Sequence, residues 1–344
     1  VTTIDFHIQN KAEDLLEKKV QELKAESGSI IVMEPKTGKV LTMANYPNFD
    51  PNRYSSYSFN SFLNSATQLT YEPGSVFKII TVAAGLDSQR IAPQTKFYDN
   101  GEVVVSGKTI KNWDFKAHGE CNVFDIIAYS LNTGAVYLEK LIGHDIFDQY
   151  VLNFGFNQKT GIDLPNEAVG NINNLKSFND IYFATASFGQ GISVTPIAMI
   201  NAFSTIANNG LMMTPYVVET IVDPEGNKEK VFEPKPKKQV ISKEVADQLR
   251  IIMVNSVEKN KVAEIQGYQI AGKTGTAQVP DANGTYSDKT IHSFIGYAPA
   301  DDPRFIILIK LDKPEASLAG STAVPMFKEL AQFILDYYEI PPAI

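Results

Sequence analysis

Strand-like runs stand at the two ends of this chain, and the long stretch between them carries mainly helix signals. Near the N-terminus, residues 29–33 and 39–43 are short β-type runs joined by a Glu-Pro-Lys-Thr-Gly turn, which predicts a hairpin. Three more runs, at about 267–279, 290–297 and 304–312, are separated by loops rich in Asp, Asn, Gly and Pro. We therefore expect one antiparallel five-stranded sheet that the two ends of the chain build together.

Helix patterns surround and separate these strands. Residues 8–23 place apolar side chains at helical spacing with Glu and Lys between them, and the segment from Pro325 to about 338 does the same. The other predicted helices cover about 75–87, 123–141 with an interruption, 145–153, 197–207 and 243–257. The helix that Thr195 caps is apolar on almost all sides, so it should lie buried under the domain centre. The pattern predicts an α/β (α+β) fold into which a helical subdomain, about residues 75–210, is inserted.

The composition excludes several classes of protein. With 44% hydrophobic and 20% charged residues, the 344-residue chain is too apolar and too evenly mixed to be disordered. Its net charge of −8 argues against nucleic acid as a partner, and its most apolar stretch, 305–309, is too short to span a bilayer. The single Cys121 excludes an intrachain disulfide, and the His residues lack zinc-site spacing, so we expect no metal and no cofactor. Because the chain begins at Val1 without signal peptide or anchor, we expect a fragment of a longer protein.

Ser75 and Lys78 are the first candidates for chemistry. They follow a Pro-Gly break at the start of a predicted helix, so Lys78 should lie one turn beyond Ser75 on the same face. A serine hydroxyl becomes a good nucleophile when a base takes its proton, and a partly desolvated lysine amine can be that base. The free backbone N–H groups and the positive dipole end of the helix start would lie near the reacting atoms.

Motifs of this kind are degenerate when they are taken singly. Lys-Thr-Gly triplets and a second Ser-x-x-Lys motif recur along the chain, at 36–38, 159–161, 273–275 and 256–259. Only the triplet that begins at Lys273 lies on a predicted strand. On that strand Lys273 and Gly275 should point to one face, and Thr274 and Thr276 to the other.

The order of three motifs removes the ambiguity. Ser-x-x-Lys at 75–78, Ser-x-Asn at 130–132 and Lys-Thr-Gly at 273–275 follow one another in the order that marks penicillin-recognising acyl-serine enzymes. The chain also resembles, almost end to end, the transpeptidase domain of class B (monofunctional) penicillin-binding proteins of the division or sporulation type. The segments that carry this resemblance are Tyr71-Glu-Pro-Gly-Ser-Val-Phe-Lys78, Lys111-Asn-Trp-Asp114 with His118-Gly119, Gly161-Ile-Asp-Leu-Pro165 with Glu167, Gly189-Gln-Gly-Ile-Ser-Val-Thr-Pro196 and Gly272-Lys-Thr-Gly-Thr-Ala-Gln278.

The resemblance implies a set of catalytic roles. Ser75 would be the acylated nucleophile and Lys78 its base. Ser130 would relay a proton to the departing D-alanine, and the charge of Lys273 would keep the Ser130 hydroxyl a proton donor. Asn132 would hydrogen-bond the backbone-like amide of the substrate.

The resemblance also implies how substrate binds along the lysine strand. Thr274, Gly275 and Thr276 would form the binding site, with the two threonine hydroxyls and Lys273 holding the terminal carboxylate. The backbone N–H groups of Ser75 and Thr276 would form the oxyanion hole.

The implied fold is the penicillin-binding and serine β-lactamase-like fold, with residues 1–344 as one transpeptidase domain that lacks an N-terminal membrane anchor and N-terminal module. The implied activity is a peptidoglycan D,D-transpeptidase that cross-links stem peptides ending in D-Ala-D-Ala, releases D-Ala and is covalently inhibited by β-lactams. Implied partners are donor and acceptor stem peptides, β-lactam antibiotics and, through the full-length protein, a membrane glycan polymerase and division or sporulation proteins. The implied location is the extracytoplasmic face of the bacterial cytoplasmic membrane.

Two alternatives on the same fold stay open. A serine β-lactamase would hydrolyse its acyl-enzyme quickly, and Glu167 with Asn171 has the spacing found in class A β-lactamases. The Gly-Ile-Asp-Leu-Pro segment ahead of Glu167 favours the penicillin-binding proteins instead. A non-catalytic β-lactam sensor or wall-binding domain would be acylated without exchanging D-alanine. An accidental resemblance would leave a soluble α/β domain with a helical insert.

Two connecting segments have the composition of loops. Residues 234–239, Pro-Lys-Pro-Lys-Lys-Gln, predict a linker. Residues 281–289, beside the lysine strand, are dominated by Asp, Asn, Gly and Ser, which predicts a loop that serves specificity or mobility.

Overall fold

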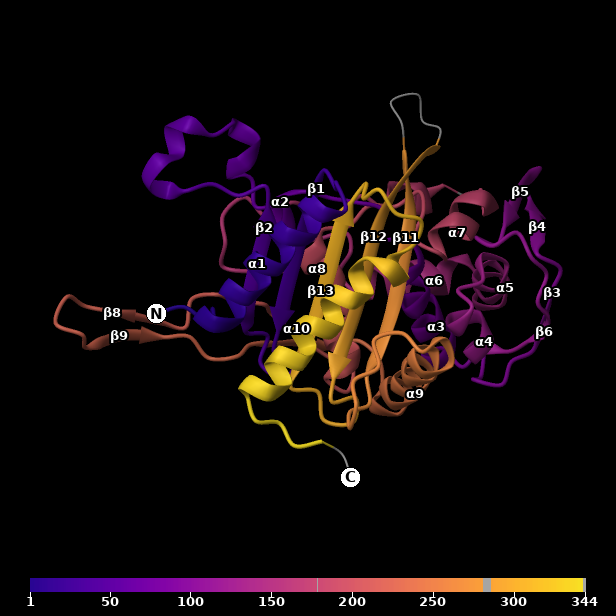
Figure 1. Ribbon diagram of the computed structural model, residues 1–344. Coiled ribbons are helices and arrows are strands. Elements are labelled where there is room, and N and C mark those ends of the chain that lie inside the picture. The colour runs from indigo at the N-terminus through magenta and orange to yellow at the C-terminus, as the bar shows by residue number, and fades with distance from the viewer. Residues whose placement is uncertain (178, 281–285, 343–344) are drawn as a thin grey trace.

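A five-stranded antiparallel sheet forms the centre of the computed structural model, which describes residues 1–177, 179–280 and 286–342 (Figure 1). In the order β11-β12-β13-β1-β2, its strands are β11 (Ala271–Pro280), β12 (Tyr286–Ala298), β13 (Phe305–Asp312), β1 (Ser27–Met33) and β2 (Val40–Tyr46). β1 pairs with β13, with Ile30 opposite Ile309, so the N-terminal hairpin is joined to the C-terminal strands. The predicted sheet, built by both ends of the chain, is confirmed.

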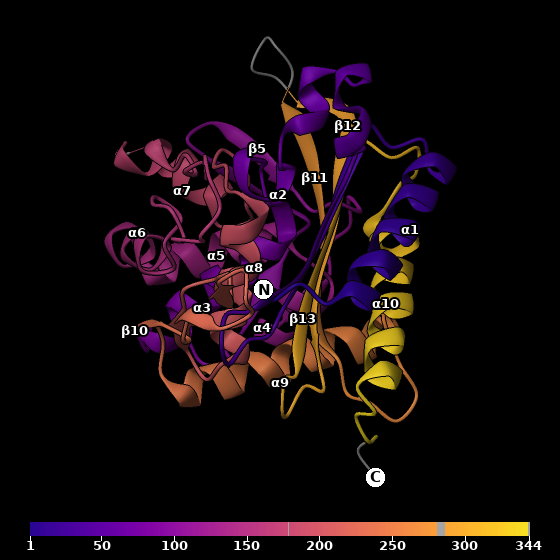
Figure 2. The ribbon, with the colours of Figure 1, turned by 90° about the vertical axis from the view of Figure 1, so that its left-hand side faces the viewer.

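The two faces of the sheet pack against different helices. On β1, Ile30 points into a core that includes α1 (Phe6–Glu22) and α10 (Ala323–Tyr337), both predicted from their apolar spacing. The next residue, Ile31, points into the core on the other face, with α8 (Pro196–Ala207). This alternation follows from the pleat of the strand. Figure 2 shows α1 and α10 together on one side of the sheet and α8 on the other.

The helices between β2 and β11 lie on the α8 side of the sheet. Besides α8 they are α2 (Ser65–Gln68), α3 (Lys78–Asp87), α4 (Val123–Ala128), α5 (Asn132–Ile142), α6 (His144–Asn153), α7 (Asp180–Ala186) and α9 (Lys243–Asn260). α8 is buried from Pro196 to Ile206, and Thr195 Oγ1 accepts the N–H of Ala198 as its cap, so the predicted buried helix is confirmed. The predicted interruption within 123–141 is the turn between α4 and α5, where Ser130 takes a φ of +57°.

Short elements outside the central sheet complete the described chain. The two-stranded sheets pair β3 (Phe97–Asp99) with β6 (Gly119–Cys121), β4 (Glu102–Val105) with β5 (Lys108–Lys111), β7 (Leu211–Met213) with β10 (Pro236–Gln239), and β8 (Thr220–Val222) with β9 (Lys228–Val231). The 3-10 turns are η1 (Pro51–Ser56), η2 (Phe59–Phe62), η3 (Gly74–Phe77), η4 (Asn173–Lys176) and η5 (Ala319–Ser321). The prediction of a linker at 234–239 is wrong for its second part. That part becomes β10 because β7 pairs with it, and local composition does not reveal a distant partner.

The hairpin between β11 and β12 corrects a second prediction. Of the predicted loop 281–289, residues 281–285 lie outside the described residues, and the remainder belongs to β12.

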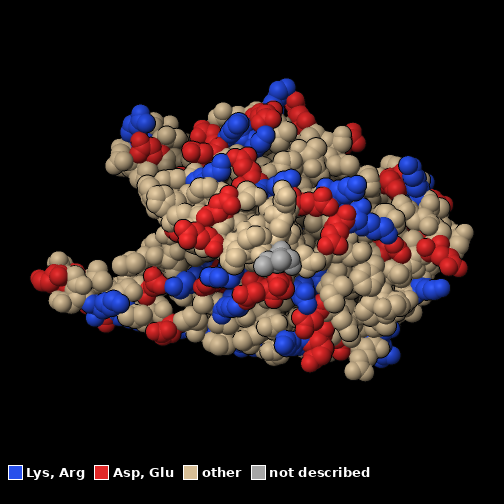
Figure 3. Space-filling view, turned by 60° about the horizontal axis from the view of Figure 1, so that its bottom comes forward, with Lys and Arg blue, Asp and Glu red and all other residues tan. Residues whose placement is uncertain are grey.

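Figure 3 shows acidic and basic side chains interspersed over the face of the molecule that it draws. Within the described part of the chain, no helix combines the length and apolar character that crossing a bilayer requires.

Candidate active site

The Ser75 hydroxyl faces the Lys78 amine at the start of a helix. The backbone turns through η3 and continues directly into α3, whose first residue is Lys78. Lys78 Nζ lies 2.9 Å from Ser75 Oγ. The two side chains meet because residues three apart lie one above the other in a 3-10 turn. Ser75 and Lys78 therefore lie on the same face, as their spacing in the sequence predicts.

Two glycines bring the backbone around Ser75 close to the lysine strand. Gly74 has a φ of +59°, and a Cβ there would lie 2.7 Å from the Cβ of Ala277 on β11. A Cβ on Gly275 would lie 3.1 Å from Val76 of η3 and would collide with Ser293 on β12. Because neither position has room for a side chain, η3 rests directly on β11. This contact sets the distance between the first motif and the third.

The Ser-x-Asn motif approaches from the turn between α4 and α5. Lys78 Nζ donates to the backbone oxygen of Ser130 at 2.6 Å and to Asn132 Oδ1 at 2.8 Å. Ser130 has left-handed backbone geometry, which is uncommon for a residue with a side chain. The indole of Trp113 donates to the backbone oxygen of Tyr129 at 2.9 Å and so supports the turn.

Lys273 reaches the same serine from β11. Its Nζ donates to Ser130 Oγ at 3.0 Å and to the backbone oxygen of Thr274 at 3.1 Å. On the other side of the hydroxyl, Lys78 Nζ lies 3.3 Å from Ser130 Oγ. The Ser130 hydroxyl is thus held between two lysine amines that come from two different motifs.

Both amines are withdrawn from water, since Lys78 and Lys273 are each 1% exposed. Burial lowers the pKa of Lys273 to about 7. Burial, and then repulsion from Lys273, lowers the pKa of Lys78 well below its usual range. The site therefore disfavours two simultaneous ammonium charges and favours one neutral lysine at neutral pH.

The residues after Lys273 follow the alternation that a strand imposes. Gly275 faces η3, whereas Thr276 Oγ1 accepts the backbone N–H of Ala319 in η5 at 3.4 Å. Thr274 is half-buried, and its Oγ1 lies 3.4 Å from Lys273 Nζ. The structure thus brings Thr274 next to the lysine cluster, while the Thr276 hydroxyl is bonded to a different segment. Of the predicted site residues, Ser75, Lys78, Ser130, Asn132 and Lys273 form one connected set of contacts.

A buried polar network behind Asn132 was missed by motif reasoning. Asp99 accepts the Thr133 hydroxyl at 2.7 Å and the Asn112 amide at 2.8 Å, which fixes the first turn of α5. The Asn132 amide donates to the backbone oxygen of Lys111 at 2.9 Å, which leaves its Oδ1 for the lysine. The signal for this network was present, because Asn112 stands in one of the segments that carry the family resemblance.

Comparison with known proteins decides the family. A family model described as the penicillin binding protein transpeptidase domain matches residues 28–332. The chain belongs to the penicillin-binding protein transpeptidase family. The resemblance inferred from the order of three short motifs is confirmed.

Relatives in this family match nearly the whole chain. Stage V sporulation protein D of Bacillus subtilis is 36% identical over 99% of this chain and 54% of the relative. The penicillin-binding protein PbpB of Mycolicibacterium smegmatis is 31% identical over 99% of this chain and 55% of the relative. The chain thus spans about half the length of these curated relatives.

Solved structures confirm the penicillin-binding fold. Penicillin-binding protein 3 from Mycobacterium tuberculosis, in complex with aztreonam, matches all of this chain and 80% of its own, with a TM-score of 0.92 and 29% identity. The transpeptidase domain of penicillin-binding protein 3 from Burkholderia pseudomallei matches with a TM-score of 0.86 and 26% identity, over 100% of this chain and 98% of its own. The predicted α+β fold of this family is therefore confirmed.

The Glu167 side chain is bonded within the loop that precedes it. Its buried carboxylate accepts the N–H and the hydroxyl of Thr160, each at 2.6 Å, and the N–H of Gly161 at 3.1 Å. Both carboxylate oxygens are therefore engaged by the loop that precedes Glu167. A water-activating base needs an oxygen directed at the reacting water, so this geometry does not favour the β-lactamase alternative.

Proposed function

We propose that this chain catalyses peptidoglycan D,D-transpeptidation through an acyl-enzyme on Ser75. Ser75 Oγ attacks the carbonyl between the two D-alanines of a donor stem peptide, and the terminal D-Ala leaves. An amine of a second stem peptide then attacks the ester and regenerates the Ser75 hydroxyl. The connected contacts from Ser75 through Lys78 and Ser130 to Lys273 carry this proposal.

Lys78 is the proposed base because its hydrogen-bond partners leave the lone pair of its neutral amine free. A neutral amine has two N–H groups and one lone pair. Lys78 can donate those two protons to the backbone oxygen of Ser130 and to Asn132 Oδ1. The lone pair is then available for the Ser75 proton, across the 2.9 Å contact. The lowered pKa of Lys78 favours this neutral form.

Ser130 and Lys273 are proposed to complete the proton path. The proton that Lys78 takes from Ser75 must reach the nitrogen of the departing D-alanine. Ser130 Oγ lies 3.3 Å from Lys78 Nζ, so Ser130 can give its own proton to that nitrogen and receive one from Lys78. The Lys273 ammonium, 3.0 Å away, stabilises negative charge that develops on the Ser130 oxygen. One proton leaves Ser75 and one arrives at the leaving amine, so the step balances.

The remaining assignments concern substrate binding. We assign Thr274, Gly275 and Thr276, with Lys273, to the terminal carboxylate, and the Asn132 amide to the substrate backbone. The backbone N–H groups of Ser75 and Thr276 are the proposed oxyanion hole. Support comes from their positions: the Ser75 N–H stands in the first turn of η3 without an intrahelical acceptor, and Thr276 lies on the edge strand β11. The Thr276 oxygen accepts the Ala319 N–H of η5, which leaves its own O–H to donate to the carboxylate.

Intact-mass spectrometry with benzylpenicillin tests the nucleophile and the fate of the acyl-enzyme. We expect one penicilloyl adduct on the chain that persists for many minutes. Ser75→Ala abolishes the adduct, whereas Ser256→Ala, in the second Ser-x-x-Lys motif, keeps it. Loss of the adduct within seconds would show a β-lactamase instead.

Exchange of D-alanine separates a transpeptidase from a β-lactam sensor. A model peptide ending in D-Ala-D-Ala is incubated with the chain and an acceptor amine such as glycine. A transpeptidase forms the new amide and releases D-Ala in equal amount. Acylation by penicillin without any exchange would assign the chain to the sensors or wall-binding domains.

We propose further that the chain works within a longer, single-pass membrane-anchored protein, with residues 75–210 as its helical subdomain. Its length relative to its curated relatives supports this setting.

The proposed location is the extracytoplasmic face of the bacterial cytoplasmic membrane, where peptidoglycan is assembled. A membrane glycan polymerase and division or sporulation proteins are the proposed partners. Protease accessibility of the full-length protein in spheroplasts tests the location, and crosslinking in cells tests the partners.

A further inference from the structure

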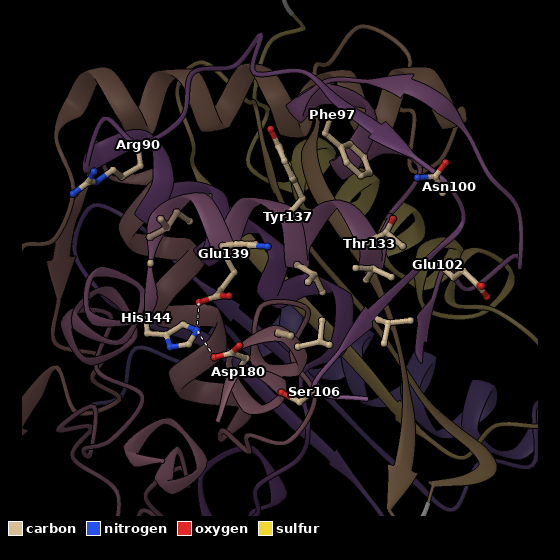
Figure 4. Close-up of a pocket in the computed structure, with 18 of the residues that line it drawn as sticks. Arg90, Phe97, Asn100, Glu102, Ser106, Thr133, Tyr137, Glu139, His144 and Asp180 are labelled. Carbon is tan, nitrogen blue, oxygen red and sulfur yellow. Dashed lines mark ion pairs between the residues drawn. The ribbon is translucent and has the colours of Figure 1, made fainter. Parts of the chain in front are cut away.

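A cavity in the helical part of the molecule lies apart from the catalytic residues. It has a volume of about 1060 Å³ and lies between α5, the start of α6, α7 and the β4–β5 hairpin (Figure 4). Its lining does not include Ser75, Lys78, Ser130 or Lys273. Sites for small organic molecules have volumes of roughly 300–1000 Å³, so this cavity is large enough for one.

Glu139 brings an unsatisfied polar atom to this cavity. The residue is 3% exposed, and its Oε1 has no hydrogen-bond partner within residues 1–177, 179–280 and 286–342. The ring nitrogen Nε2 of His144, half-exposed at the start of α6, lies 3.6 Å from Oε1, beyond normal hydrogen-bond length. Because a buried acceptor without a donor costs free energy, a ligand that brings a donor would recover it.

The charges around Glu139 favour a donor that is a cation. The Asp180 carboxylate lies 3.9 Å from the same His144 nitrogen, on the side away from Glu139 Oε1 (Figure 4). The Asp, Glu, Lys and Arg side chains of the lining are four acidic and two basic ones, namely Glu102, Glu139, Asp145, Asp180, Arg90 and Lys140. Burial, and then repulsion from Asp180, raises the pKa of Glu139 to about 7. A cation beside the carboxylate would restore its ionised form.

The other walls are apolar and aromatic. Val103 and Val105 of β4 and Val136 of α5 line the cavity. At its far end the rings of Phe97 and Tyr137 stack, with centroids 5.3 Å apart. These surfaces suit an apolar or aromatic body, and an aromatic face also attracts a cation.

We propose that this cavity is a binding site for a small organic cation, a primary ammonium group carried on an apolar or aromatic body. The ammonium donates to the Glu139 carboxylate beside the His144 ring, while Asp180, at the cavity mouth on the other side of that ring, adds a weaker attraction over a longer distance. The body packs against the valines of β4 and the Phe97–Tyr137 pair. The site does not depend on the proposed transpeptidation, because it uses a different set of side chains.

Benzylammonium is the probe that tests the site, with benzyl alcohol as its neutral counterpart of similar shape. Both are titrated into the intact chain and followed by calorimetry and by backbone-amide NMR. We expect benzylammonium to bind at least about tenfold more tightly than the alcohol, and to shift the amide signals of Val103, Val136 and Gly143. Equal affinity for the two compounds, or shifts confined to the catalytic residues, would overturn the proposal.

Three variants locate the charge that the ammonium recognises. Glu139→Gln keeps the shape of the side chain and should weaken benzylammonium at least about tenfold. Asp180→Asn, at an exposed side chain, should weaken it by a smaller factor. Glu244→Gln, an exposed change on α9, should leave the affinity unchanged. An unchanged circular dichroism spectrum shows that each variant is folded, and unchanged affinity in both Glu139→Gln and Asp180→Asn contradicts the site.

Discussion

Buried titratable side chains lie at two places along α5, and they differ in how their polar atoms are satisfied. The first residue of α5, Asn132, borders the Lys78–Lys273 cluster, where each amine contacts several oxygen atoms. About two turns later, Glu139 Oε1 has no hydrogen-bond partner among the described residues. Burial alone therefore does not distinguish the two places. The amines of the lysine cluster are satisfied by oxygen atoms of the protein, while Glu139 Oε1 has no donor among the described residues.

The largest expected effect comes from removing the proposed base. Lys78→Arg keeps a positive charge, but an arginine does not lose its proton at accessible pH. We expect acylation of Ser75 by benzylpenicillin to slow by about 10³-fold, within the usual range for loss of a general base. Stopped-flow or quenched intact-mass kinetics measures the rate. The matched change Lys259→Arg, in the second Ser-x-x-Lys motif, should have no effect, and a fast Lys78→Arg enzyme would exclude Lys78 as base.

The pH dependence of acylation should report both lysines. Acylation needs a neutral Lys78, so the rate should rise with pH as that amine loses its proton. It should fall again above about pH 7, where Lys273 loses the charge that assists Ser130. In Lys273→Arg the charge persists, so the alkaline fall should disappear, although the rate is lower throughout. The control Lys159→Arg, in another Lys-Thr-Gly triplet, should keep the bell-shaped dependence of the acylation rate on pH. If the fall of the rate at alkaline pH persists in Lys273→Arg, it must come from a group other than Lys273.

The ionised Glu139 carboxylate should lower the free energy of unfolding, whereas a carboxylate in a stabilising ion pair would raise it. The pKa of Glu139 is raised from 4.5 to about 7, so the folded protein binds a proton more tightly than the unfolded chain and stability falls as pH rises between these values. Glu139→Gln removes this penalty, while the facing His144 and Asp180 remain. Relative to wild type, the variant should gain up to about 3 kcal/mol in unfolding free energy between pH 4 and pH 8. Urea unfolding at the two pH values measures the gain, and Glu244→Gln serves as control.

The smallest expected difference, between alanine variants of two glycines, concerns how tightly the backbone is packed near each group of side chains. Gly74 and Gly107 both have positive φ, but a Cβ on Gly74 would meet Ala277, whereas a Cβ on Gly107, in the hairpin beside the cavity, would meet open space. Alanine at either position costs about 1–2 kcal/mol of backbone strain. Gly74→Ala should cost about 2 kcal/mol more through the collision and should also slow acylation. Chemical unfolding and acylation kinetics of both variants test this, and equal costs would show that η3 can move away from β11.

Periodicity and turn residues predicted the parts of the fold that depend on local patterns. The amphipathic α1 and α10, the buried α8 and the strands of the central sheet were all anticipated within a few residues. The strand β10 was not, because it exists only through pairing with β7. The Asp99 network was also missed, since a buried aspartate between polar neighbours looks like an ordinary loop residue in the sequence.

By itself, the sequence determined the chemical groups and their order: Ser75 with Lys78, then Ser130, then Lys273. These follow from residue type, spacing and a resemblance that the family match confirms. Only the tertiary structure decided that two lysine amines converge on the Ser130 hydroxyl and that the Thr276 hydroxyl accepts a hydrogen bond from η5. Convergence and burial depend on how distant segments pack, and burial is what shifts a pKa. The same reason explains why nothing in the local sequence marked Glu139 as an unsatisfied acid.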